Sequence, residues 1–162
     1  MSFTDTERVI LANQYEILGK LSKSNEKTYL DLAESLRDGH EWIYDDKISV
    51  SPIFDRDKSD FVVSILELYE VIQDSFDALS DKGSLTLDRV KFPGFDGNNE
   101  GDYMRFFSAL VKNQQFAHVK ANTNSHMQKI STYKAMLNKW ESLGKEYKLS
   151  LDDIEAIFDR KS

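Results

Sequence analysis

Apolar residues recur at intervals of three and four along most of the chain, and this spacing places them on one face of an α-helix. The first such set comprises Ile10, Leu11, Tyr15, Leu18 and Leu21. Before it, Thr4 and Glu7 form a capping-box pattern, in which each side chain accepts a hydrogen bond from the other residue's backbone N–H. We therefore expect a helix from about residue 4 to residue 21, with these apolar residues buried.

A second helix is expected between a cap at Ser24 or Asn25 and a stop at Gly39, because glycine readily adopts the positive φ that ends helices. Residues 40–57 mix aromatic, acidic and proline residues without helical periodicity. Pro52 also disfavours helix at the residue before it. We expect irregular backbone here, with a short strand at 48–50 as an open alternative.

The widest apolar face lies between residues 59 and 79, which predicts a long central helix packed by the next two long helices. Its apolar residues include Phe61, Val62, Ile65, Leu66, Leu68, Tyr69, Ile72, Phe76 and Leu79. One short helical turn is expected from Thr86 to Val90.

The C-terminal half predicts three more helices. One runs from about residue 99 to residue 116, one is capped by Ser125 and stopped by Gly144, and the last is opened by Ser150. The fold class is therefore all-α. We expect a single compact domain of five to seven helices spanning residues 1–162, with Trp42 and Trp140 as core or interface anchors.

Composition narrows the class of protein. The chain has 162 residues, 40% of them hydrophobic, which suits one domain with a real core. The absence of cysteine excludes disulfides, thiolate metal sites and cysteine nucleophiles. No apolar run approaches the ~18 residues typical of a membrane span, and the first residues lack a secretory signal pattern. We expect a cytoplasmic protein that does not enter a membrane.

Charge is unevenly distributed along the chain. The net charge is −7 overall, made up of −11 over residues 1–102, +6 over residues 103–148 and −2 over residues 149–162. A basic segment in an acidic protein can bind an anion or nucleic acid, or it can pack beside acidic helices. The candidate anion-binding residues are Arg105, Lys112, Lys120, Lys129 and Lys134.

Residues 92–103 form a turn-rich segment whose acidic side chains are candidate metal ligands. Asp96, Asn98, Glu100 and Gly101 match four positions of a calcium-binding EF-hand loop, but the position that needs a bidentate glutamate is Phe107. The three histidines fit no zinc spacing. We therefore expect no metal, no cofactor and no assigned catalytic residue, and whether the chain is an enzyme stays open. A small enzyme that pairs His118 with Asp96 or Glu100 remains one alternative.

Several segments resemble the YfbU-like family of small bacterial proteins over nearly the whole chain. They run from Glu7 to Tyr15, from Arg89 to Asp96, from Tyr133 to Trp140 and from Tyr147 to Ser150. His118 stands where a family histidine is expected. The resemblance implies a shared helical fold. It carries over no reaction and no catalytic residue.

Polar residues interrupt the apolar pattern of the first helix at Arg8, Asn13 and Gln14. They could line a polar pocket beside the 92–98 loop with Asp96 and His118, or they could satisfy backbone groups there. The function expected from all these features is a non-catalytic interaction module that self-associates, as a homodimer, or binds a protein partner. The alternative is nucleic-acid or anion binding through residues 103–148.

Overall fold

The computed structural model describes residues 2–159, and these residues form eight α-helices and no β-strand beyond two isolated bridges. The predicted all-α class is confirmed, with a helix count slightly above the expected five to seven. The helices group into two compact units that divide between Ile53 and Phe54. We call them the N-terminal unit and the C-terminal unit.

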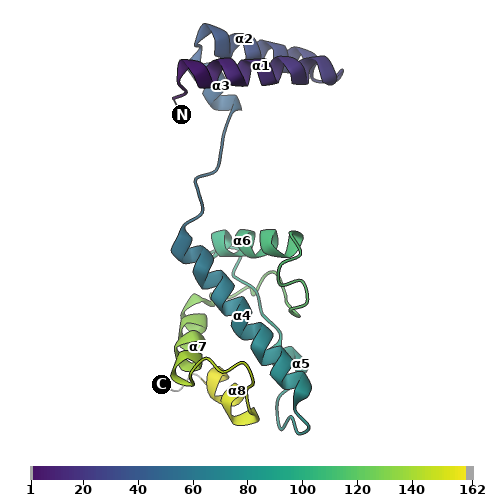
Figure 1. Ribbon diagram of the computed structural model, residues 1–162, viewed down its shortest axis with the longest axis vertical. Coiled ribbons are helices and arrows are strands. Elements are labelled where there is room, and N and C mark those ends of the chain that lie inside the picture. The colour runs from purple at the N-terminus through teal and green to yellow at the C-terminus, as the bar shows by residue number, and fades with distance from the viewer. Residues whose placement is uncertain (1, 160–162) are drawn as a thin grey trace. The chain divides into compact units, whose positions relative to one another are not determined.

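The N-terminal unit consists of three helices, α1 (Asp5–Leu21), α2 (Glu26–Asp38) and α3 (Glu41–Lys47). Helices α1 and α2 lie side by side as a hairpin (Figure 1). The predicted capping box is present, since the Thr4 hydroxyl accepts from the Glu7 amide and the Glu7 carboxylate accepts from the Thr4 amide. Gly19 permits a close approach, because a Cβ there would lie only 3.1 Å from the Leu30 side chain.

The core of the N-terminal unit is small. It consists of Ala12, Leu32, Ala33, Leu36 and Tyr44. Leu11 and Tyr15 are half-buried against it, as expected. The prediction that Ile10, Leu18 and Leu21 are buried is wrong within this unit, because the face of α1 that meets α2 lies on the other side of the helix.

Helix α3 corrects the expectation of irregular backbone after Gly39. Its one buried residue, Tyr44, packs against Phe3 with ring centroids 5.8 Å apart. This tertiary contact supports a short helix whose sequence has no clear period of its own. The alternative strand at 48–50 does not form.

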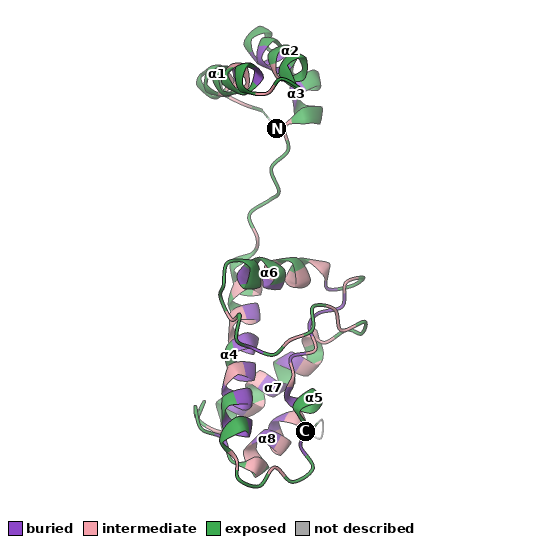
Figure 2. Ribbon diagram, turned by 90° about the vertical axis from the view of Figure 1, so that its right-hand side faces the viewer, coloured by how far each residue is buried: buried purple, intermediate pink, exposed green. Residues whose placement is uncertain are grey.

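Helix α4 (Arg56–Ala78) is the central helix of the C-terminal unit, as predicted. Helices α6 (Gly101–Lys112) and α7 (Ile130–Ser142) pack against it, and Figure 2 shows buried residues along its length. Helix α5 (Leu87–Val90) is the expected short turn, with Thr86 as its cap. Helix α8 (Leu151–Phe158) packs on α7 and begins with the predicted cap at Ser150.

Two helix boundaries differ from the prediction. Helix α6 ends at Lys112 rather than near residue 116. Gln114 and Phe116 then take positive φ angles, which a right-handed α-helix does not contain. Helix α7 begins at Ile130 rather than after Ser125, whose hydroxyl donates to the Met127 carbonyl instead. The predicted stop at Gly144 is confirmed by its φ of 79°.

Two extended segments lie side by side in the C-terminal unit. Parallel bridges join Phe92 to Ala121 and Phe95 to Asn124. The side chain of Gln73 on α4 binds both segments. Its Nε2 donates to the carbonyls of Val90 and Lys120, and its Oε1 accepts from the Lys120 N–H. These contacts position the loop of residues 113–129 without regular secondary structure. None of the helices formed by residues 2–159 is long and apolar enough to cross a membrane.

Candidate functional site

One face of α1 carries exposed apolar side chains. Ile10, Ile17, Leu18 and Leu21 are 51%, 58%, 43% and 77% exposed, respectively, and the exposed Gln14 lies among them. We call these five residues the α1 stripe. Because the buried residues Ala12 and Gly19 follow Ile10 and Ile17 by two positions, they face the opposite side of the helix, toward α2. The α1 stripe is therefore uncovered by the rest of the hairpin.

Charge runs along α1 in one direction. Asp5 and Glu7 lie in its first turn, Lys20 lies in its last turn, and Lys23 follows. Glu7 keeps its negative charge firmly, because hydrogen bonds from the backbone and side chain of Thr4 lower its pKa. Asp5 already forms an ion pair with Arg8, and Lys20 forms one with Glu16, which leaves Glu7 near one end of the α1 stripe and Lys23 just beyond the other.

Helix α3 presents a second exposed apolar group in the same unit. The indole of Trp42 is 87% exposed, and Ile43 beside it is 43% exposed. The interpretation of Trp42 as a core residue is therefore wrong within the N-terminal unit. The interpretation of Trp42 as an interface anchor stays a prediction. Trp140 in the C-terminal unit is buried, as a core anchor should be.

Two of the polar residues predicted on the first helix tie α1 to α2. Arg8 donates to the Leu36 carbonyl at 3.0 Å and forms an ion pair with Asp5. Asn13 accepts from Arg37 at 3.0 Å. Gln14 is exposed. Arg8 and Asn13 therefore have structural partners in the hairpin.

The other two members of the predicted polar pocket, Asp96 and His118, lie in the C-terminal unit. Asp96 is buried, and its carboxylate accepts from the Asn98 amide and the Asn99 side chain. The bond from Asn99, followed by that from Asn98, lowers the pKa of Asp96. A pocket that joins Asp96 and His118 to Arg8, Asn13 and Gln14 stays a prediction.

Glu100 has a structural role. Its carboxylate accepts from the backbone N–H groups of Asp96, Lys129 and Ile130 at 2.7–3.0 Å. The last two bonds satisfy amides at the start of α7, where negative charge is also favoured by the helix dipole. The carboxylates of Glu100 and Asp96 thus already have hydrogen-bond partners in the loop and helix around them. In the described part of the chain, no group of three or more acidic or histidine side chains is arranged to hold a metal ion.

His118 pairs with a residue that the sequence did not indicate. Its Nε2 lies 2.7 Å from Oε1 of Glu70 on α4, 48 positions away along the chain. The alternative acid–base pair of His118 with Asp96 or Glu100 is therefore not the contact that forms. Both His118 and Glu70 remain partly exposed, so the pair resembles a surface ion pair more than a catalytic dyad.

The five candidate anion-binding residues differ in how far acids already neutralise them. Lys120 forms an ion pair with Asp77 at 3.1 Å, and Arg105 forms one with Asp102. Among residues 2–159, no ion pair is found for Lys112, Lys129 or Lys134. The basic segment is therefore partly compensated within its own unit.

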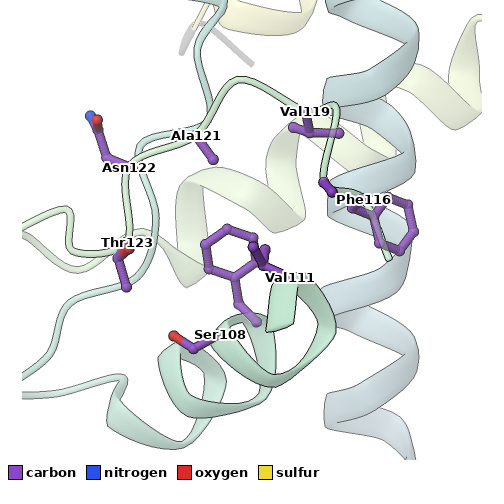
Figure 3. A pocket seen from close by; sticks show the side chains of 9 residues that line it. Ser108, Val111, Phe116, Val119, Ala121, Asn122 and Thr123 are labelled. Carbon is purple, nitrogen blue, oxygen red and sulfur yellow. The ribbon is translucent and has the colours of Figure 1, made fainter. Parts of the chain in front are cut away.

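A groove of about 350 Å³ lies between the C-terminal half of α6 and residues 116–123 (Figure 3). Its apolar lining comprises Phe107, Val111, Phe116, Ala117, Val119 and Ala121, and its polar side chains are Ser108, Asn122 and Thr123. None of these side chains titrates near neutral pH. The groove offers apolar contact and a few hydrogen bonds, and it has no acid–base group of its own.

Comparison with known proteins matches residues 1–160 to the YfbU domain. The chain belongs to the YfbU family. The resemblance seen in the sequence is thereby confirmed, and one YfbU domain match spans both compact units.

Relatives of similar length share about a third of their residues with this YfbU chain. The UPF0304 proteins of Mannheimia succiniciproducens and Actinobacillus succinogenes are each 30% identical, over 98% of this chain and 99% of their own lengths. A UPF0304 protein of the archaeon Methanocaldococcus jannaschii is 33% identical, over 94% of this chain and 96% of its own length.

Proposed function

We propose that this YfbU protein is a non-catalytic, cytoplasmic interaction module that self-associates through the apolar surface of its N-terminal unit. The α1 stripe is the observation that carries the proposal. Contiguous exposed apolar residues on a globular protein commonly mark a protein–protein contact. The exposed indole of Trp42 adds support, since tryptophan is enriched among the residues that dominate binding energy at interfaces.

The free energy that burial of the α1 stripe can contribute suits a reversible contact. Full burial of an isoleucine or leucine side chain contributes roughly 1.5–3 kcal/mol. The four apolar residues of the stripe are already partly covered, so eight of them in a dimer would contribute on the order of 10 kcal/mol. Association costs roughly 4–15 kcal/mol in lost freedom and ordering. The gain and the cost are of the same order, so the dimer that we propose is one that dissociates on dilution.

Sedimentation of the full chain over a range of concentrations tests this proposal. We expect a concentration-dependent dimer, and Ile17→Glu should make the chain monomeric while its circular dichroism stays unchanged. Leu87→Glu is the matched control, because Leu87 is an exposed apolar residue on α5 in the other unit. A wild-type chain that stays monomeric up to about 100 µM would contradict the proposal.

Nucleic-acid or anion binding through residues 103–148 is the competing function. Phosphate contacts make affinity fall steeply as salt rises. The same samples, mixed with RNA or DNA at low and high salt, distinguish the two functions: a salt-sensitive complex formed by monomeric protein would favour the competitor.

A further inference from the structure

We infer that the partner of the α1 stripe is the α1 stripe of a second copy, with the two helices antiparallel. This inference rests on the proposed self-association and adds which element meets which, and in what direction. Three features of α1 support it: the spacing of its apolar residues, the order of its charges and the position of α2.

Four of the five stripe residues are symmetric about the level between residues 15 and 16, and the fifth, Leu18, would lie at the level of Asn13 of the other copy. In an antiparallel pair centred there, Ile10 of one copy lies opposite Leu21 of the other, and Gln14 lies opposite Ile17. The stripe spans 12 residues, from Ile10 to Leu21, and so about 16 Å at 1.5 Å per residue. Every apolar end residue then meets another apolar residue, which is the self-complementarity that a two-fold interface requires.

The charges of α1 distinguish the antiparallel pair from the parallel one. A parallel pair would bring Glu7 to the level of its own copy, and Lys23 to the level of its own copy. An antiparallel pair places Glu7 of one copy near the level of Lys23 of the other. It also opposes the two helix dipoles, which favours the same direction.

Helix α2 leaves the stripe accessible. It packs on the side of α1 that carries Ala12 and Gly19, about half a turn away from the stripe. Two α1–α2 hairpins can therefore meet through their α1 helices, with each α2 on the outer side. The resulting pair is closed, because each stripe is covered by the other.

The chain has no cysteine, so introduced thiols report contacts without background. The experiment uses four full-length variants, Ile10→Cys, Leu21→Cys, Gln14→Cys and Ile17→Cys, with one copy of each mixture carrying a mass tag. Dimerisation of each variant is checked by sedimentation before a short bis-maleimide is added. Leu87→Cys, on exposed α5, measures crosslinking by random collision.

We expect the mixture of Ile10→Cys with Leu21→Cys to give the mixed crosslinked dimer, and each of these two variants alone to give no more than Leu87→Cys. The mixture of Gln14→Cys with Ile17→Cys should also crosslink. This second pair tests the same arrangement if the substitutions at Ile10 and Leu21 weaken the dimer.

Two results would overturn the inference and leave self-association standing. Crosslinking of Ile10→Cys with itself, without enrichment in the mixture, would show a parallel pair. A dimer whose stripe variants crosslink no better than Leu87→Cys would place the contact on another surface. Monomeric protein in every sample would overturn the proposed function together with the inference.

Discussion

At the scale of single residues, the buried polar groups of this protein hold loops to helices. Glu100 satisfies amides at the start of α7, and Gln73 binds the carbonyls of Val90 and Lys120. The described chain has no buried side-chain nitrogen or oxygen atom without a hydrogen-bond partner. Removing such a group is costly because its partners stay buried and unpaired.

The two tryptophans should respond to truncation very differently. Trp140 is 3% exposed and its Nε1 donates to the Glu146 carbonyl, whereas Trp42 is 87% exposed. Trp140→Ala should lower the free energy of unfolding by about 3–5 kcal/mol through the cavity that it leaves. Trp42→Ala should change it by less than about 0.5 kcal/mol. Urea unfolding monitored by circular dichroism at a concentration where the chain is monomeric measures both, and equal effects would contradict this assignment.

Asp96 should make stability depend on acidic pH. Its pKa in the folded protein lies below the ordinary value of 3.8, chiefly because of the bond from Asn99. The unfolded chain therefore binds a proton first as pH falls, and the stabilisation by Asp96, complete above the ordinary pKa, is lost as pH falls through the lowered one.

Asp96→Asn removes this titration. The variant should be less stable than the wild type near neutral pH, and the difference should shrink between about pH 5 and pH 2.5. Urea midpoints at both pH values measure it. Glu7 and Asp153 also have lowered pKa values, so both proteins should still lose stability in acid. A difference that stays constant across the pH range would show that Asp96 acts without its charge.

At the scale of elements, local sequence signals explain some boundaries and distant contacts explain others. The starts of α1 and α8 and the end of α2 follow from caps at Thr4, Ser150 and Gly39. The late start of α7 could not be predicted, because it depends on Glu100, 29 positions earlier than Lys129. For the same reason the sequence could not indicate Glu70 as the partner of His118.

The candidate surfaces were likewise predictable from the sequence only in part. Periodicity indicated an amphipathic first helix, but it could not tell which apolar residues face α2 and which stay exposed. The positions of Ala12 and Gly19 decide this, because small residues allow α2 to approach closely. The groove beside α6 was also missed, since it forms only where residues 116–123 return to α4.

The pairing of the two extended segments depends on Gly94. Its φ is +85°, and a Cβ there would lie 2.4 Å from the Thr123 carbonyl oxygen. Gly94→Ala should therefore cost on the order of 2–4 kcal/mol of unfolding free energy, from backbone strain and the displaced segment.

Gly101→Ala is the matched control for this change. Gly101 is the first residue of α6, and a Cβ there would lie 3.6 Å from the Arg105 side chain, an ordinary van der Waals distance. Alanine also lowers the conformational entropy of the unfolded chain. Thermal unfolding should show Gly101→Ala at or above the wild-type midpoint and Gly94→Ala well below it. Similar midpoints for the two variants would argue against a strained, crowded site at Gly94.

At the scale of the whole molecule, one family domain contains two units of different build. The N-terminal unit has a small core and several exposed apolar side chains on α1 and α3. The C-terminal unit has a larger core around α4, with aromatic rings of Tyr69, Phe92 and Tyr133 in mutual contact. This contrast is the reason why the proposed self-association is assigned to the N-terminal unit.

The two units also differ in how far apart along the chain their contacts lie. The hydrogen bond from Arg8 to Leu36 in the hairpin joins residues 28 positions apart, whereas the C-terminal unit joins Gln73 to Lys120 across 47 positions and Ser75 to Leu149 across 74. Local contacts form fast, and domains fold from the N-terminus during synthesis. The hairpin is therefore expected to form while most of the chain is still being translated. Its α1 stripe would then be available to a neighbouring nascent chain, so that assembly could begin on the ribosome.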